Sequence, residues 1–153
     1  MVLFKVLNAQ IIAKQYQKLS RLHDERDASV DAIKAKGFED AKEERKIAKA
    51  KQKSVKKISK LHKAYLNQLD KHLTEQQIDA VKDGMTYGVL PKTYAAHLEM
   101  IPSLTESQKQ YIYNNLKEAR ERAMDAGSSK EKHAWFGKYK GRINNYLSAE
   151  GYD

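Results

Sequence analysis

The segment from residue 38 to residue 69 carries two repeats of the same period. Its apolar residues recur mostly at intervals of three or four, the spacing of one face of an α-helix. They are Ile47, Val55, Ile58, Leu61, Tyr65 and Leu69. Lysines recur at alternating intervals of four and three on the opposite face, at Lys42, Lys46, Lys49, Lys53, Lys56, Lys60 and Lys63. Two such repeats in register predict one long helix with an apolar face and a charged face.

The preceding segment, residues 3–36, predicts a second long helix. Its apolar stripe is made of Phe4, Ile11, Ile12, Tyr16, Leu19, Leu22, Val30 and Ile33. Arg26 falls inside the stripe beside acidic neighbours, which favours a paired or snorkelling arginine over one that faces a ligand. Gly37 breaks the helix, and a break this short predicts that the two long helices pair antiparallel.

His23 and Asp27 lie one helical turn apart and could share a metal ion. Two ligands without a third are weak grounds for a site, because structural and catalytic zinc sites use at least three protein ligands. The chain also contains no Cys, which excludes disulfides, thiol catalysis and thiolate metal sites. We therefore predict no metal and no cofactor.

Shorter helices should follow in the C-terminal half. Thr74 and Thr105 each begin a T-x-x-Q word, which predicts a capping box at a helix start. Gly84 is expected to close the first of these helices. The words Leu73–Gln77 and Leu104–Gln108 also resemble the L-T-x-x-Q repeat of small periplasmic helical chaperones of the Spy and CpxP kind.

Two further boundaries follow from proline and from the apolar period. Pro91 suits the first position of a helix that runs to about Ile101, and Pro102 ends that helix. Residues 106–126 then read as a full helix. The side chains expected to face inward are Tyr111, Ile112, Leu116, Ala119 and Ala123.

The most unusual stretch is Met124–Leu147, which is rich in aromatic and glycine residues. Gly127 stands where a left-handed residue commonly closes a helix. Ser128 and Glu131 form an S-x-x-E capping box, so a last helix should begin there. One face of that helix would carry Trp135, Phe136, Tyr139, Ile143, Tyr146 and Leu147.

Beside that face lie two glycines one turn apart, Gly137 and Gly141, each of which costs the helix roughly 1 kcal/mol relative to Ala. Close approach by another helix or by a ligand would explain them. We expect helix packing at Gly141 and a ligand, if there is one, near Gly137. The candidate ligand-binding residues are His133, Trp135, Gly137, Tyr139, Lys140, Arg142 and Asn144.

The net charge of +9 is placed unevenly along the chain. Residues 1–73 hold 18 Lys and Arg against 9 Asp and Glu, and residues 74–153 hold 11 of each. A solvated helix face is the favoured explanation of this excess. The alternative is an acidic partner such as nucleic acid, anionic lipid or acidic polysaccharide, bound at Lys49, Lys53, Lys56 and Lys60. Nucleic acid is the least favoured, since no aromatic residue interleaves the lysines to stack on bases.

Three stretches resemble one known family: Leu22–Asp27, Lys82–Tyr94 and, most specifically, Met124–Leu147. The family is the domain of unknown function 3826, known from Bacteroidetes. The resemblance implies an exported, periplasmic or otherwise extracytoplasmic helical protein without an established activity, often encoded beside carbohydrate-utilisation genes. The first ten residues, however, do not read as a signal peptide, and no apolar run approaches the roughly 18 residues of a membrane span.

We therefore expect a single all-α domain, with a long basic hairpin over residues 1–72 and about four shorter helices over residues 73–153. No motif of a known enzyme class is present, so no catalytic residue is predicted. The leading expectation is a non-catalytic binding or interaction protein of the bacterial envelope, linked to glycan use. The alternatives are a chaperone-like protein that holds protein clients and, third, a carbohydrate-active enzyme that uses the C-terminal site. The oligomeric state stays open.

Overall fold

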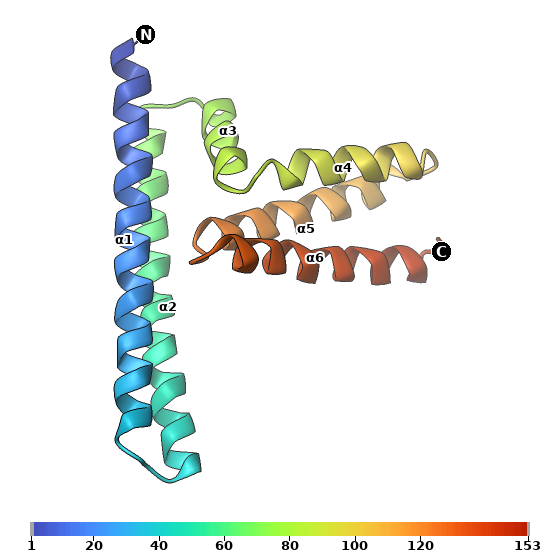
Figure 1. Ribbon diagram of the computed structural model, residues 1–153. Coiled ribbons are helices and arrows are strands. Elements are labelled where there is room, and N and C mark those ends of the chain that lie inside the picture. The colour runs from blue at the N-terminus through green and yellow to red at the C-terminus, as the bar shows by residue number, and fades with distance from the viewer. Residues whose placement is uncertain (1, 153) are drawn as a thin grey trace. The chain divides into compact units, whose positions relative to one another are not determined.

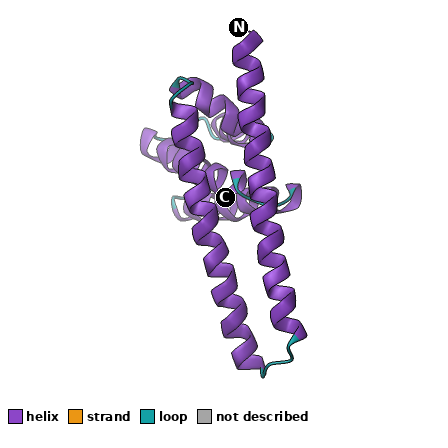
Figure 2. Ribbon diagram, turned by 90° about the vertical axis from the view of Figure 1, so that its left-hand side faces the viewer, coloured by secondary structure: helices purple, strands orange, loops and turns teal. Residues whose placement is uncertain are grey.

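A computed structural model describes residues 2–152 of the chain, and their side chains from residue 9 onward. This part of the chain contains six helices and no strand (Figure 2). The predicted all-α class is confirmed. The helices form two compact units, Met1–Lys71 and His72–Asp153. Each is described by itself below.

The first unit is an antiparallel hairpin of α1 (Val2–Ala35) and α2 (Asp40–Asp70) (Figure 1). Gly37 makes the reversal possible, because its φ of +65° lies in the left-handed region that a side chain disfavours. The amide of Gly37 donates to the carbonyl of Lys34 across 3.3 Å, which closes the last turn of α1. The hairpin and its break are as predicted.

The interior of the hairpin is partly polar. Ile11 and Leu19 of α1 and Tyr65 and Leu69 of α2 are buried, but so are the polar side chains of Gln15, His23 and Ser54. Two residues of the predicted apolar stripes are exposed instead, Tyr16 at 38% and Val55 at 62%. The periodicity placed Val55 inward, but its neighbour Ser54 takes the inward position. The side chain of Phe4 lies outside the described residues.

The second unit contains α3 (Glu75–Met85), α4 (Val89–Met100), α5 (Glu106–Met124) and α6 (Ser129–Ala149). The last two helices form an antiparallel pair on which the others pack (Figure 1). One apolar cluster joins α4, α5 and α6 through Leu90, Leu104, Ile112, Leu116, Ile143 and Leu147. A second cluster joins α5 to α6 through Ala119, Ala123, Phe136 and Tyr139.

The helix starts follow the sequence closely. Thr74 and Thr105 both form complete capping boxes. The threonine hydroxyl accepts from the backbone N–H of the glutamine three residues later, and the side-chain oxygen of that glutamine accepts from the backbone N–H of the threonine. Ser128 likewise accepts from the amide of Glu131 across 3.2 Å. The Glu131 carboxylate, however, accepts from the amide of Gly127 rather than from that of Ser128.

Three predicted helix boundaries, two ends and one start, are wrong by a few residues. Gly127 is not left-handed, and α5 closes at Asp125 in the ordinary helical region. Gly84 lies inside α3, which continues to Met85. Pro91 is the third residue of α4 rather than the first. All of the first-turn positions lack an intrahelical partner for their N–H, so proline is tolerated at any of them.

Candidate functional site

The C-terminal end of α3 has an unusual backbone. Tyr87 and Gly88 are both left-handed, with φ values of +60° and +64°. The amide of Gly88 donates to the carbonyl of Asp83 across 2.8 Å, the bond that defines a Schellman helix end. Glycine normally occupies the position of Tyr87 in this motif, and a residue with a side chain costs roughly 1–2 kcal/mol there. In the described part of the chain, Tyr87 is the one non-glycine residue with a positive φ.

The strained backbone presents an aromatic pair. Tyr87 is 48% exposed, and its ring stacks on the imidazole of His133 with 5.2 Å between centroids and 13° between planes. Next to His133 on α6, the buried Lys132 places its Nζ 5.6 Å from the centre of the Tyr87 ring. The same Nζ donates to the carbonyl of Met85 across 2.9 Å. The first turn of α6 therefore holds both the backbone and the ring at the end of α3.

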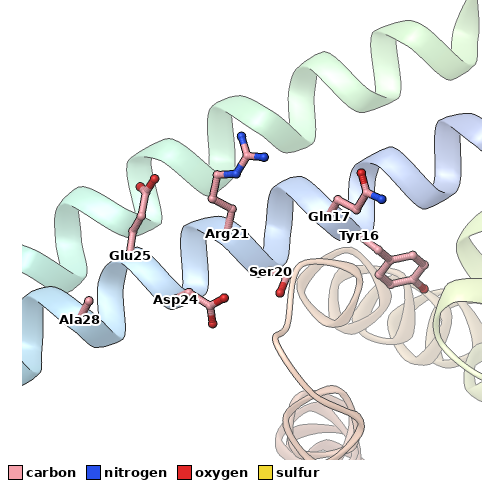
Figure 3. A pocket seen from close by; sticks show the side chains of 7 residues that line it. All are labelled: Tyr16, Gln17, Ser20, Arg21, Asp24, Glu25 and Ala28. Atoms are coloured by element: carbon pink, nitrogen blue, oxygen red, sulfur yellow. The ribbon is translucent and has the colours of Figure 1, made fainter.

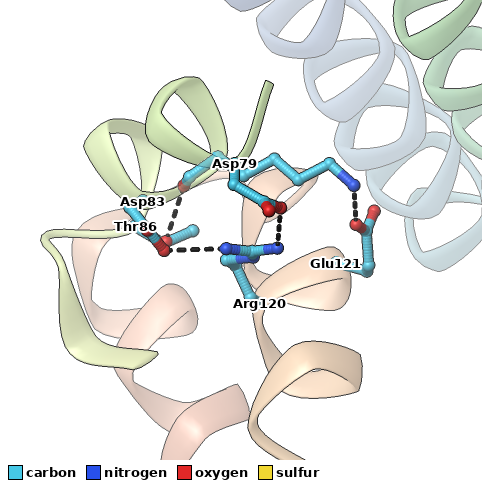
Figure 4. Close-up of polar contacts among 6 residues, drawn as sticks. Asp79, Asp83, Thr86, Arg120 and Glu121 are labelled. Atoms are coloured by element: carbon cyan, nitrogen blue, oxygen red, sulfur yellow. Dashed lines mark hydrogen bonds and ion pairs between the residues drawn. The ribbon is translucent and has the colours of Figure 1, made fainter. Parts of the chain in front are cut away.

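Arg120 of α5 holds α3 from the other side (Figure 4). Its side chain is buried, and its two terminal nitrogens donate to Asp83 across 2.9 Å and to Asp79 across 2.8 Å. Burial alone would lower the pKa of the guanidinium, but the hydrogen bonds to Asp83 and Asp79 raise that pKa above its ordinary value. Arg120 is thus a fixed cation that clamps two successive turns of α3.

Two further contacts involve this end of α3, one with α5 and one within its own last turn (Figure 4). Lys82 forms an ion pair with Glu121 of α5. The fully buried Thr86 donates its hydroxyl hydrogen to the carbonyl of Lys82 across 2.7 Å. The end of α3 is therefore held by side chains from α5 and α6 together, and Tyr87 emerges from this rigid frame. We call Tyr87 and His133 the aromatic pair.

The structure divides the predicted ligand-binding residues between two sides of α6. His133 belongs to the aromatic pair. Trp135 is two residues further on, about 200° around the helix, and lies between Arg122 and Lys138 at 5.7 and 5.4 Å from its ring centre. Tyr139 is buried in the core, and Arg142 covers its ring at 4.5 Å.

By helical spacing, Lys140 and Asn144 fall on the His133 flank, because they follow it by seven and eleven residues. Lys140 is half-buried, and Asn144 is exposed. Of the predicted residues, His133 is the one that contacts Tyr87. At 1.5 Å per residue, Lys140 and Asn144 lie roughly 10 and 17 Å further along α6, and Trp135 and Arg142 lie on another side of the helix.

The prediction that helix packing explains the two glycines of α6 is wrong. A Cβ built on Gly137 or on Gly141 would meet nothing within 4 Å, and both residues are exposed. Neither close helix packing nor a neighbouring backbone requires a missing side chain there. The two glycines lie on the outward face of α6, away from the apolar face that carries Phe136 and Ile143.

Several residues of the site were not predicted, although the sequence contains a signal for two of them, Lys132 and Arg120. Lys132 continues the buried stripe of Phe136, Tyr139 and Ile143, and Arg120 lies between the buried Ala119 and Ala123. A cation on an apolar stripe indicates a buried charge with a partner. Tyr87 lies between Gly84, predicted to close one helix, and Pro91, predicted to start the next, so the sequence alone indicates only a link there.

Two other regions contribute less. Figure 3 shows a pocket lined by α1 alone, from Tyr16 to Ala28. Side chains from one straight helix diverge, so they do not enclose a ligand. The candidate anion-binding lysines Lys49, Lys53, Lys56 and Lys60 are all exposed on α2. Among the described residues, no helix combines the length and apolar character that crossing a membrane requires.

Comparison with known proteins identifies the family of this chain. No curated protein matches the chain. The model of the family described as "Protein of unknown function (DUF3826)" matches residues 4–153, essentially the whole chain, and the protein belongs to that family.

Proposed function

We propose that the protein is a non-catalytic binding protein of the bacterial envelope that takes a carbohydrate-like ligand at the aromatic pair. One observation carries the proposal: Tyr87 is held in a disfavoured backbone conformation with nearly half of its surface exposed, stacked on His133. Strained residues gather at functional sites, where the surrounding structure over-determines them.

The chemistry of the pair suits a sugar. The C–H face of a pyranose ring packs against an aromatic face, and its hydroxyl groups need polar partners around that contact. The exposed imidazole of His133 supplies one such group beside the Tyr87 ring. A tyrosine whose ring already contacts His133 and Lys132 adds contact area at little further cost in side-chain entropy.

The charges around the pair favour binding over catalysis. Arg120 is engaged by two carboxylates, and Lys132 donates to the carbonyl of Met85. Groups engaged in this way position a surface, whereas an acid–base catalyst needs a proton that it can exchange with a substrate. The envelope location and the link to glycan use rest on the family resemblance.

A client-holding chaperone receives less support. Such a protein presents a large contiguous apolar surface. The exposed large apolar side chains of the described residues are instead few in each unit, with Tyr16 and Val55 in the first and Tyr87 and Met100 in the second. We therefore do not propose the chaperone role.

Isothermal titration calorimetry of the protein against a panel of neutral and uronate-containing oligosaccharides tests the proposal. Binding to at least one member is expected, with a loss of tenfold or more in Tyr87→Gly, which removes the ring and relieves the backbone at once. Tyr16→Ala removes an exposed tyrosine of α1 and serves as the matched control. Failure of the whole panel to bind, or unchanged binding by Tyr87→Gly, would refute the proposed site.

A further inference from the structure

The half of the hairpin nearest Gly37 buries its own apolar side chains only in part. Between residues 24 and 53, no residue is buried. The apolar residues of this region, Val30 and Ile33 on α1 and Ile47 on α2, are only partly buried. The opposite half of the hairpin, by contrast, has a buried interior that includes Leu19 and Leu69. Two helices alone leave one side of their shared apolar seam open, and a third element is the usual way to cover it.

A groove follows this open seam. One stretch, of about 300 Å³, is lined from α1 by residues that include Leu22 and Arg26 and from α2 by residues that include Ser54. A second stretch, of about 310 Å³, continues toward the turn and has Ile33 and Phe38 among its lining residues. Ala50 and Lys53 line both stretches, so the two meet there.

The rim of the groove is cationic. Its two stretches include six cations, Arg26, Lys36, Lys46, Lys49, Lys53 and Lys57, against the single carboxylate of Glu25. Glu25 is paired with Lys57 at 3.6 Å, and Arg26 with Asp27 at 3.1 Å. Lys36, Lys46, Lys49 and Lys53 form no ion pair with any carboxylate of the described residues.

The groove also contains an unused polar atom. The Ser54 side chain is 6% exposed, and its hydroxyl oxygen has no hydrogen-bond partner. This oxygen is itself covered by its surroundings, so the groove presents to an occupant only the apolar and cationic side chains that line it.

From this geometry we infer that the groove is a docking site for an acidic amphipathic helix of a partner protein. The small apolar floor of Ala32, Ile33 and Ala50 suits the apolar stripe of a helix, and the lysine rim suits Asp and Glu on either side of that stripe. A second copy of this hairpin would bring lysines against lysines. Nucleic acid would lack aromatic partners for its bases, since Phe38 is the one aromatic residue in the groove and Lys42 and Lys46 already lie over its ring.

The test uses the full-length protein and a synthetic 21-residue peptide with leucines at helical spacing and glutamates on both flanks, labelled for fluorescence anisotropy. A second peptide carries glutamine in place of every glutamate. The glutamate peptide should bind and become helical by circular dichroism, and the glutamine peptide should bind at least tenfold more weakly. Absence of binding by the glutamate peptide overturns the inference.

Two matched charge variants locate the site. Lys46→Gln, Lys49→Gln and Lys53→Gln together remove three charges from the rim and should weaken binding at least tenfold. Lys56→Gln, Lys60→Gln and Lys63→Gln together remove the same charge from lysines that do not line the groove and should change binding less than threefold. Equal losses would show attraction by net charge alone and would overturn the inference.

One further variant tests the apolar floor, and one competitor tests the class of ligand. Ile33→Gln keeps every charge and should weaken binding at least fivefold. Heparin, a polyanion without an apolar stripe, should compete poorly at equal charge concentration. Unchanged binding by Ile33→Gln, or heparin that binds as tightly as the peptide, would replace the helix-docking site with a general polyanion surface.

Discussion

The ring of Tyr87 lies nearly parallel to the imidazole of His133, with 5.2 Å between their centres. The contact joins the left-handed end of α3 to the first turn of α6. It exists because Arg120 and Lys132 hold α3 in place from two neighbouring helices. The position and the strain of Tyr87 are therefore properties of the packed unit rather than of α3 itself.

A pair of substitutions at Tyr87 separates the ring from the backbone. Tyr87→Ala loses the stacking contact and keeps the left-handed strain, whereas Tyr87→Gly loses the contact and relieves the strain. The glycine variant should therefore be more stable than the alanine variant by about 1 kcal/mol. Urea denaturation of both variants measures the difference. Equal midpoints and slopes would mean that the backbone at Tyr87 is not strained.

Removal of the Arg120 guanidinium should weaken the attachment of α3. Arg120→Met leaves the carboxylates of Asp79 and Asp83 without their cation, and breaking a buried ion pair from one side costs about 3–5 kcal/mol. Asp79 is 49% exposed, so water compensates part of the loss and the lower end of that range is expected.

Urea denaturation compares Arg120→Met with Asp79→Asn, which removes only the more exposed carboxylate and should cost no more than about 1 kcal/mol. The double variant Arg120→Met with Asp83→Asn should be more stable than Arg120→Met alone, since the less exposed unpaired carboxylate is then gone. A double variant less stable than the single one would argue against Arg120 as the counter-charge of Asp83.

Alanine at either outward glycine of α6 should stabilise the protein. Gly137→Ala and Gly141→Ala place a Cβ in open space, and each should raise the free energy of unfolding by up to about 1 kcal/mol because alanine has the higher helix propensity. Gly88→Ala is the control, since its φ of +64° makes any side chain unfavourable, and it should lower the melting temperature. A lower melting temperature for Gly141→Ala would restore the helix-packing explanation that the structure contradicts.

Alkaline pH should destabilise the hairpin through Tyr65. Burial, with a smaller contribution from Tyr16, raises the pKa of Tyr65 from 10.0 to about 12. The folded state thus favours the neutral phenol, so this contribution to stability is complete below pH 10 and is lost as pH rises from 10 through 12. The difference between a pKa of 10.0 and one of about 12 corresponds to at most about 3 kcal/mol in the free energy of unfolding.

The measurement is the free energy of unfolding of the parent and of Tyr65→Phe between pH 8 and pH 12. Because phenylalanine cannot ionise, the parent should lose stability relative to the variant only above pH 10. Parallel curves for the two proteins across this range would show that Tyr65 ionises as readily when folded as when unfolded.

The sequence was sufficient for features that depend on near neighbours in the chain. Thr74 and Gln77, like Thr105 and Gln108, are three residues apart, so the capping boxes follow from local geometry alone. The apolar period likewise identified most of the buried face of α6, including Phe136 and Ile143, since a helix repeats its faces regardless of what covers them.

Only the tertiary structure decided which faces meet and which stay open. The period of α6 does not say whether Gly137 and Gly141 meet another helix, and they meet none. Asp83 and Arg120 lie far apart in the chain, as do Tyr87 and His133, and no local pattern pairs them. The physical reason is that helical periodicity gives the direction of a side chain around the axis of its own helix. The partner across the interface is set by the packing of several helices at once, and it is that packing that stabilises a tyrosine where a helix end ordinarily requires glycine.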